Sequence, residues 1–296
     1  MLAKKKIKRL RSNGANPKKF DRSQIKFLAY LVPICIMMAL PIIFIVMNAF
    51  KPMDELFAYP PRFFVRNPTL SNFKNLFSLS STTAISPLRY LFNSSIASVC
   101  VVFATLLLSL SAGYVLSKKH FKYKQLLFDI NTLGMMFVPI AVSIPRYFVI
   151  VYTGMQKTFL ANIIPLLVTP TSVFLVKQFM DQLPDALIEA AVIDGANDIQ
   201  ILRRIVMPMV KPAMATVAIV AFQNVWNSAE ASNLFIDNET LKTFSFYLST
   251  LSASAGGVSG QGVAAAASLI MLLPNLVLFI VLQSRVMDTM AHSGIK

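Results

Sequence analysis

The chain has 296 residues, of which 55% are hydrophobic and only 14% are charged, and its formal net charge is +15. Soluble domains carry about a quarter of charged residues, so this composition excludes a soluble fold and indicates a membrane protein. Ten of the 28 Lys and Arg residues lie in residues 1–26, against the single acid Asp21. Such a cluster marks the cytoplasmic end of a membrane protein and can touch anionic lipid, so the charge requires no nucleic-acid partner.

The spanning segments can be read as uncharged stretches, since a helix of about 20 residues crosses the hydrocarbon core. Four such stretches are residues 27–50, 90–117, 159–176 and 212–229, and a fifth lies within 243–284. The fifth stretch is too long for one crossing, and the Gly- and Ser-rich residues 254–262 predict a turn that leaves a helix at about 263–283. A further span at about 126–152 contains Asp129 and Arg146. We therefore expect an all-α membrane protein with six transmembrane helices.

This count fixes the expected organisation of the chain. A basic cytoplasmic arm, residues 1–26, precedes a six-helix transmembrane domain, residues 27–284, and a short tail follows at residues 285–296. With an even number of crossings, both termini lie in the cytoplasm, and the protein is a multi-pass component of the bacterial cytoplasmic membrane. Residues 51–89 form an external connector.

A polar segment at residues 181–211 interrupts the apolar sequence. Its chemistry predicts a short helix from about Pro184 to Ile193, after which Gly195 can adopt a left-handed conformation that ends the helix. Asn197 or Asp198 can cap a second helix, which Pro208 and Pro212 are expected to end. Its apolar residues can fill a socket on a partner or anchor the loop to its own helices; they are Leu187, Ile188, Ile193, Leu202 and Ile205.

The segment also carries a pattern at fixed spacing, E-A-A-x3-G-x9-I-x-L-P, with Met207 in place of Leu. The residues that meet it are Glu189, Ala190, Ala191, Gly195, Ile205 and Pro208. The pattern resembles the EAA signature of binding-protein-dependent ABC importer permeases of type I, whose cytoplasmic coupling loop is gripped by an ATPase. Weaker matches resemble the maltose-type carbohydrate permeases; they are Lys51–Phe73, Asn93-Ser94-Ser95, Ile144-Pro145, Trp226-Asn227 and Ser293–Lys296.

The resemblance implies a permease subunit for a carbohydrate, with an oligosaccharide as the expected class. It also implies the partners of this subunit: a second permease, two ATPase subunits and an extracytoplasmic binding protein. It implies that the ATPase contacts Glu189, Ala190, Ala191, Asp194, Gly195, Ala196, Arg203 and Pro208. Glu189 would offer a charged contact, and the small Ala190 and Ala191 would allow close approach. ATP and Mg²⁺ would be bound by the ATPase subunits, because this chain has no G-x-x-x-x-G-K-[ST] phosphate loop and is not expected to be an enzyme.

The sequence leaves three other functions open. Permeases for peptides, amino acids or polyamines share the coupling loop. A secondary transporter would use charges within the membrane, and a membrane-embedded enzyme would need a reactive constellation in its spans. The two histidines, His120 and His292, lie in separate segments, so no metal site or bound cofactor is expected.

Two groups of residues are candidates for the solute pathway. Arg146 is costly within a membrane and can face the pathway, snorkel to the interface or pair with a carboxylate of a partner subunit. The second group is a polar patch formed by Gln223, Asn224, Trp226 and Asn227. Its amides and its aromatic ring suit sugar hydroxyls and apolar sugar faces, but interfacial anchoring of the Trp and hydrogen bonds between helices are equally compatible with the pattern.

Overall fold

The computed structural model describes residues 23–78, 85–167, 169–254 and 258–293, and the residues it describes contain helices and no strand. Three of these helices are long and apolar enough to cross a membrane singly, namely α2 (Ser23–Phe50), α5 (Pro87–Lys118) and α15 (Val258–Ser293). The chain is therefore a multi-pass membrane protein. The basic arm up to residue 22 and the last three residues of the tail lie outside the described residues.

Two bent pairs of helices can supply further crossings. The first pair consists of two 3-10 turns, η2 (Phe159–Asn162) and η3 (Ile164–Leu167), followed by the helix α8 (Pro170–Asp181). The helix is bent by 42° relative to the turns. In the second pair, a bend of 83° separates Asp198–Met209 from Lys211–Leu234, which contains α12 (Lys211–Trp226) and α13 (Glu230–Leu234). The described residues thus give three crossings, or five if each bent pair is one span.

The expected sixth span is not one helix. Residues 126–152 fall into α6 (Lys124–Met136) and α7 (Ser143–Tyr152), which a non-helical turn at 137–142 separates. Pro139 lies in this turn; proline cannot donate a backbone hydrogen bond and disfavours helical geometry at the preceding residue, Val138. The prediction of a single helix here is therefore wrong.

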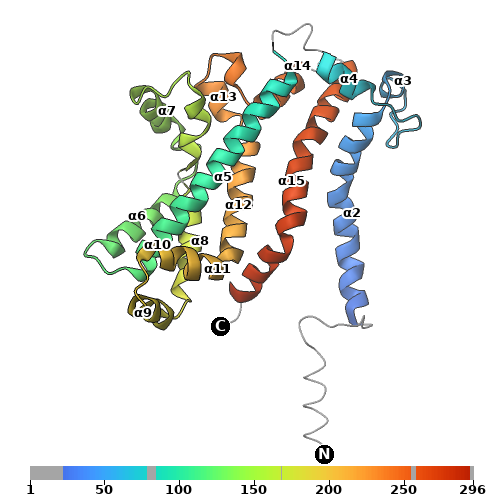
Figure 1. Ribbon diagram of the computed structural model, residues 1–296. Helices are drawn as coiled ribbons and strands as arrows, with labels where there is room; N and C mark the ends of the chain where they lie inside the picture. Colours follow the sequence, from blue (N-terminus) through green and yellow to red (C-terminus); the bar gives the residue numbers. More distant parts are fainter. Residues whose placement is uncertain (1–22, 79–84, 168, 255–257, 294–296) are drawn as a thin grey trace, which may run out of the picture.

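The remaining elements cover the two ends of the bundle (Figure 1). One end, which we call the α9 end, carries α9 (Asp185–Ile193), α10 (Asp198–Ile201), the π-helical turn η4 (Leu202–Val206) and α11 (Met207–Met209). The other end, which we call the α13 end, carries α3 (Met53–Leu56), α4 (Ser71–Ser78), α7, α13, η5 (Glu239–Leu241) and α14 (Phe244–Ser254).

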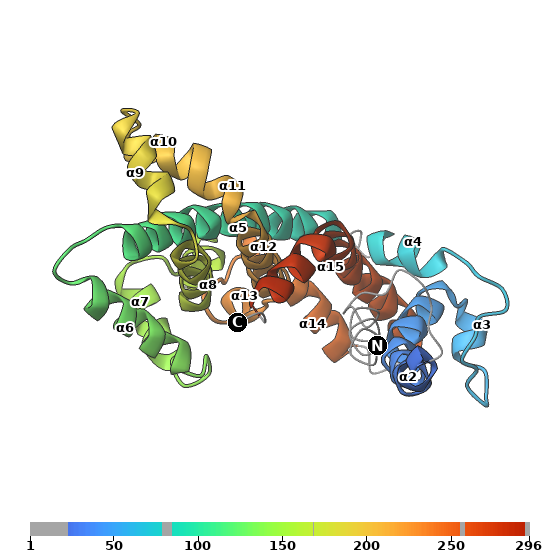
Figure 2. The same cartoon turned by 90° about the horizontal axis from the view of Figure 1, so that it is seen from below.

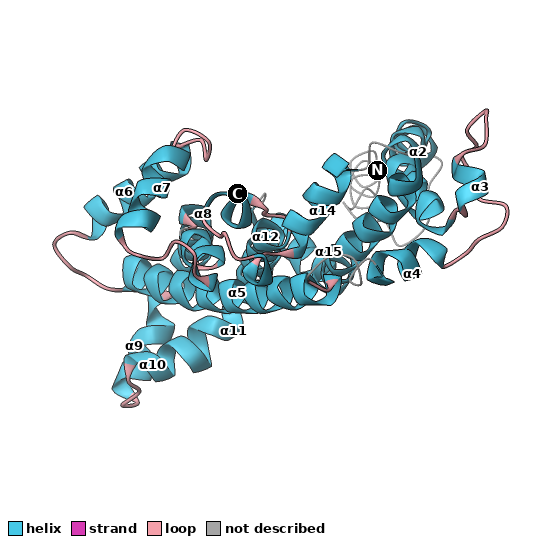
Figure 3. Ribbon diagram, turned by 90° about the horizontal axis from the view of Figure 1, so that it is seen from above, coloured by secondary structure: helices cyan, strands magenta, loops and turns pink. Residues whose placement is uncertain are grey.

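Helix α5 lies at the centre of the packing and contacts α8 and α12, while α15 contacts α12 and α2. Seen along the bundle, α2 and the pair α6–α7 lie at opposite ends of an elongated row, and α9–α11 project past α5 (Figures 2 and 3). Helix α2 packs on α15 near its C-terminal end, where Ala49 meets Ala266 and Leu269. Toward its N-terminus α2 diverges from α15 and exposes apolar side chains such as Met37 and Met38.

The C-terminal end of α2 is capped by a side chain from α4. Asn72 is buried, and its Nδ2 donates to the carbonyl oxygens of Ala49 (3.0 Å) and Lys51 (2.8 Å). These carbonyls have no partner within the helix, so the amide satisfies groups that would otherwise stay unpaired. A Cβ atom at Gly262 would lie only 2.6 Å from Asn72 Oδ1, so a glycine lets α15 approach this cap.

Helix α15 begins at Val258, five residues earlier than expected from the Gly- and Ser-rich sequence. Ser259, Gly260, Gln261 and Gly262 are helical, and α14 continues to Ser254. The prediction that all of residues 254–262 form a turn is therefore wrong, and residues 255–257 lie outside the described part. Local composition overstated the turn because Gly262 serves the close contact with Asn72.

Candidate functional site

The polar segment forms two short helices joined at Gly195, as expected. Helix α9 starts after Pro184 and ends at Ile193, and Gly195 has a φ of +81°, in the left-handed region. The amide of Ala196 donates to the carbonyl of Ala191 at 2.9 Å, which closes the end of the helix. We call residues 181–211 the coupling loop, after the segment that their sequence resembles.

Asn197 is the residue that caps the second helix. Its Oδ1 accepts from the amide of Gln200, and the Gln200 Oε1 accepts from the amide of Asn197, both at 2.9 Å. This reciprocal pair is a capping box, in which two amides that lack helical partners are satisfied at once. Of the two caps that the sequence allowed, the structure selects Asn197, and Asp198 becomes the first residue of α10.

Pro208 does not end the second helix. The chain continues from α10 through the π turn η4 and then α11, in which Pro208 occupies the first turn. The amide of Met207 donates to the carbonyl of Leu202, five residues back, so the hydrogen bonds change register just before the proline. A proline in a first turn leaves no required donor missing. The break comes instead at Val210, where the path bends by 83° into α12.

The apolar residues of the coupling loop divide into two sets. Ile188, Leu202 and Ile205 pack on a core that contains Tyr114 of α5 and Met180 of α8. The tip of the loop instead exposes apolar side chains, with Ile193 at 86% and Ile199 at 75% exposure, and Leu187 and Val192 are exposed beside them. The loop is therefore anchored by one face and presents an uncovered apolar surface on the other.

The candidate contact residues are placed unevenly. Those exposed are Glu189, Ala190, Asp194, Gly195, Arg203 and Pro208, while Ala196 is half-buried. Ala191 is buried in the core with Ile201 and Val206, so its small side chain serves packing within this chain and does not let a partner approach, contrary to our expectation. In the described part of the chain, Glu189 is exposed and forms no salt bridge.

The end of α5 is fastened to both helices of the coupling loop. Lys118 Nζ donates to Leu183 O and to Asp185 Oδ1, each at 2.6 Å, and the Lys118 side chain is only 6% exposed. Lys119 Nζ donates to Asp198 Oδ1, also at 2.6 Å. Asp185 and Asp198 are the first residues of α9 and α10, where a carboxylate also complements the positive end of the helix dipole.

Two hydroxyl groups of α5 extend this fastening. Ser117 Oγ donates to Asp181 Oδ1 at the end of α8 (2.7 Å), and Tyr114 OH donates to Asp198 Oδ1 (3.3 Å). The other oxygen of Asp181 accepts from Lys177 Nζ at 2.6 Å. Residues 117–119, which we call the α5 anchor, thus reach α8, α9 and α10 in turn.

The acidic partners of the α5 anchor are held in their charged form. The hydrogen bond from Lys118 and its positive charge hold the pKa of Asp185 below its usual value of 3.8. The hydrogen bond from Lys119 lowers the pKa of Asp198 in the same way and outweighs the opposing effect of desolvation. Both ion pairs are therefore present throughout the physiological pH range.

Arg146, the charged candidate in α7, pairs with a carboxylate of its own chain. Its guanidinium lies 3.2 Å from Glu230 Oε2, at the start of α13, and the Arg146 side chain is 26% exposed. Of the alternatives raised by the sequence, pairing is the one observed, although the carboxylate belongs to this chain and not to a partner subunit. Sequence reasoning missed Glu230 because 84 residues separate the two side chains.

The structure does not bring the four residues of the polar patch onto one surface. Gln223, Asn224 and Asn227 are exposed, but Trp226 is buried, and its indole N–H donates to the Met271 carbonyl of α15 at 2.9 Å. The Trp226 nitrogen therefore takes part in a hydrogen bond between the helices α12 and α15. The ring also lines part of an apolar cavity of about 520 Å³ between α5, α12 and α15.

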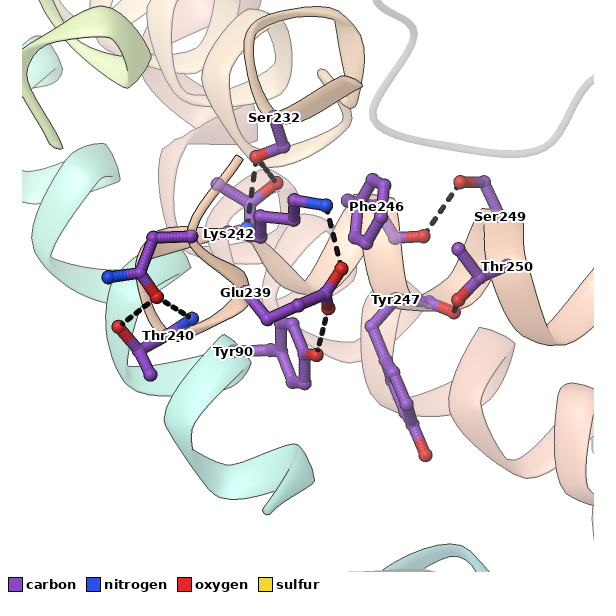
Figure 4. A network of polar contacts seen from close by, with 11 residues as sticks. Tyr90, Ser232, Glu239, Thr240, Lys242, Phe246, Tyr247, Ser249 and Thr250 are labelled. Atoms are coloured by element: carbon purple, nitrogen blue, oxygen red, sulfur yellow. Dashed lines mark hydrogen bonds and ion pairs between the residues drawn. The ribbon is translucent and has the colours of Figure 1, made fainter. Parts of the chain in front are cut away.

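A second polar network, which the sequence analysis did not single out, lies at the α13 end (Figure 4). Glu239 accepts hydrogen bonds from Tyr90 OH (2.8 Å) and from Lys242 Nζ (2.7 Å). Burial would raise the pKa of Glu239, but the hydrogen bonds from Lys242 and Tyr90 outweigh it and lower the pKa. Asn93 Nδ2 also donates to the carbonyls of Thr240 and Lys242, each at 2.8 Å. The segment after α13 is thus fixed to the start of α5.

Comparison with known proteins places these features in context. Residues 105–284 match the protein family described as "Binding-protein-dependent transport system inner membrane component". Protein LplC of Bacillus subtilis (strain 168) is 31% identical over 219 residues, which are 74% of this chain and 71% of that protein. The arabinooligosaccharides transport system permease protein AraQ of the same strain is 24% identical over 278 residues, 94% of this chain and 97% of that protein.

A solved structure shows the same fold. One chain of a bacterial ABC transporter involved in the import of the acidic polysaccharide alginate superposes with a TM-score of 0.74 at 19% identity. The superposition covers 90% of this chain and 98% of that chain. The likeness therefore extends through the spanning helices and is not confined to the coupling loop.

Proposed function

Because the chain belongs to the family of binding-protein-dependent transport system inner membrane components, we propose that it is the permease subunit of an ABC importer for a carbohydrate, with an oligosaccharide as the preferred class. The observation that carries this proposal is the coupling loop, in which a helix, a left-handed Gly195 and a second helix present exposed apolar residues around Glu189. The names of AraQ and of the alginate importer support the carbohydrate class. They favour it over peptides, amino acids or polyamines.

The proposal includes partners that the chain needs in order to work. A second permease would complete the pathway, two ATPase subunits would bind ATP and Mg²⁺, and an extracytoplasmic binding protein would deliver the solute. The coupling loop then faces the cytoplasm of a bacterium, and the α13 end faces outward. Both termini lie on the cytoplasmic side in this proposal, which requires that α6 and α7 together supply a sixth, broken crossing. The exposed Ile193 and Ile199 support an ATPase contact, because apolar side chains at the tip of a polar loop gain by burial in a partner.

In this function the chain converts a movement of the ATPases into a movement of helices. Closure of the ATPase pair on ATP would displace the coupling loop, and the packed helices would rock so that the pathway opens outward and then inward. The chain needs no catalytic residue of its own for this step. Differential contact with the two ATPase states is what biases the permease between its two openings.

The candidate pathway residues differ in what they can offer a sugar. Exposed amides of Gln223, Asn224 and Asn227 suit hydrogen bonds to sugar hydroxyls, whereas the buried Trp226 nitrogen is already bonded. Arg146 is neutralised by Glu230, so the pair carries no net charge that would select an anionic sugar over a neutral one.

The test is a pull-down of the tagged, detergent-solubilised chain from its native host, followed by identification of the bound proteins. We expect an ATPase and a second permease with the wild type, and a loss of the ATPase alone with Glu189→Lys and with Ile193→Asp. Asn75→Lys, an exposed change on α4 at the α13 end, is the matched control and should keep the ATPase. A stable wild-type chain that binds no ATPase would contradict the proposal and favour a secondary transporter.

A further inference from the structure

The α5 anchor joins the coupling loop to α5, a helix that is not next to the loop in the sequence. Helix α8 precedes the loop and α12 follows it, whereas Lys118 and Asp185 are 67 residues apart. The contacts of residues 117–119 are therefore tertiary. They connect the loop to α5, which contacts both α8 and α12 within the bundle.

The covalent links of the loop to its neighbouring helices are bent. Residues 182–184 form a non-helical link between α8 and α9, and the path into α12 turns by 83° at Val210. The π turn at Leu202–Val206 is a further irregularity of the backbone, a few residues before the bend at Val210. A displacement of α9 and α10 can be absorbed at such breaks, because a few residues at element ends take up most of a hinge movement. Helix α5, in contrast, is continuous from Pro87 to Lys118.

The α5 anchor resists such displacement for an electrostatic reason. The Lys118 side chain is almost fully buried, and a buried charge that loses its partners is strongly unfavourable. Its two acceptors, Leu183 O and Asp185 Oδ1, lie on either side of Pro184 at the entry to α9. When the loop moves, Lys118 is thus held to it, and α5 follows.

Apolar contacts alone would not enforce the same coupling. Leu110 and Tyr114 of α5 share a core with Ile201 and Val206 of the loop. Such contacts are non-directional, so helices can slide over one another while the buried area stays similar. The ion pairs at Asp185 and Asp198 fix two points and thereby set both the position and the orientation of the loop relative to α5.

We propose that residues 117–119 are positioning residues that transmit the displacement of the coupling loop to α5, so that α5 moves as one body with α9 and α10 when ATP binds. The inference rests on the proposed function, because it needs an ATPase that displaces the loop. Lys118 is the principal element, and Lys119, whose side chain is 42% exposed, is the secondary one.

The experiment measures the movement of α5 directly and needs no solute. The complex is purified through the tagged chain with Cys35 and Cys100 replaced by Ser. Spin labels are placed at Val99→Cys on α5 and Val281→Cys on α15, two side chains that are 69% and 67% exposed. The distance between the labels is measured by pulsed electron paramagnetic resonance, without nucleotide and with ATP plus orthovanadate.

Four variants are compared with the wild type: Lys118→Met, Lys118→Arg, Lys119→Met and the control Lys122→Met. Lys122 is an exposed lysine of the same segment, and its Nζ lies 5.6 Å from the centroid of the Tyr123 ring. None of the ion pairs between described residues includes it. We expect Lys118→Met to lose more than half of the nucleotide-dependent shift while the ATPase stays bound and ATP hydrolysis continues. Lys118→Arg should restore the shift, Lys119→Met should reduce it, and Lys122→Met should behave like the wild type.

The outcomes separate the inference from the function on which it rests. A wild-type complex without an ATPase would overturn the proposed function. If the wild-type complex shows the nucleotide-dependent shift and both Lys118→Met and Lys119→Met keep it in full, the role of the α5 anchor alone would be overturned. If Lys118→Met does not assemble, Lys119→Met decides, because the Lys119 side chain is 42% exposed and its replacement disturbs less of the packing.

Discussion

Replacing Gly262 by Ala should loosen the junction of α2, α4 and α15. The added Cβ would lie 2.6 Å from Asn72 Oδ1 and 2.8 Å from Leu56 Cδ1. The end of the Leu56 side chain can move aside. The Asn72 amide cannot move without lengthening its hydrogen bonds to the carbonyls of Ala49 and Lys51, which are 3.0 and 2.8 Å long.

The size of the effect follows from three contributions. Two weakened hydrogen bonds cost about 1 kcal/mol each. An overpacked contact costs about 1–3 kcal/mol, and the greater helix propensity of Ala returns about 1 kcal/mol. We therefore expect Gly262→Ala to lower the free energy of unfolding by about 2–4 kcal/mol, and Asn72→Ala, which loses the two hydrogen bonds, to lower it by about 2 kcal/mol.

The two substitutions should not be additive. Once Asn72 is Ala, the atoms that the new Cβ meets at 2.6 and 2.8 Å are gone, except for the mobile end of Leu56. The assay is unfolding of the purified chain in mixed micelles, followed by circular dichroism, with the exposed Asn75→Ala as the control. If the double variant were destabilised by the full sum of the single effects, the proposed clash with the Asn72 cap would be refuted.

Three further predictions concern the polar residues. Gly195→Ala should destabilise the coupling loop by about 1 kcal/mol and Gly195→Asn by less, because Asn tolerates a positive φ; limited proteolysis of the loop measures this. Arg146→Gln and Glu230→Gln should each lower the melting temperature, and the double variant should lower it by less than their sum; additive shifts would show that the ion pair contributes nothing. Because the pKa values of Asp185 and Asp198 lie below 3.8 in the folded chain, their contribution is complete above that pH and is lost as the pH falls through the lowered values. Loop protection should thus be flat from pH 8 to about 4 and fall below it, and a decline near pH 6 would contradict the assignment.

The sequence predicted those features that depend on local chemistry. Gly195 and Asn197 act through their own backbone and side-chain preferences, so the helix and the left-handed turn could be placed, and the cap narrowed to two neighbouring residues, from a short stretch of sequence. Long uncharged stretches likewise located α2 and α5 closely. Both kinds of signal are complete within one segment of the chain.

Features that depend on distant residues could not be predicted in this way. Ala190 and Ala191 are chemically identical, and only the packing of α9 on α5 and α8 shows that one is exposed and the other buried. Similarly, the partner of Arg146 lies 84 residues away, and Lys118 and Lys119 read only as positive charges that mark a cytoplasmic loop. The helical start of α15 depends on Gly262 meeting Asn72, which local composition cannot reveal.

The π turn at Leu202–Val206 constrains how the chain can vary. A π turn holds one residue more than the α-helical turn it replaces, and each residue of an α-helix turns the chain by about 100°. Loss of one residue here would therefore rotate α10, with the exposed Ile199, by roughly that angle relative to α12. The tip of the coupling loop would then point away from its present direction even if every contact type were kept. The segment between Asn197 and Pro212 should accordingly tolerate many substitutions over evolutionary time but resist insertions and deletions.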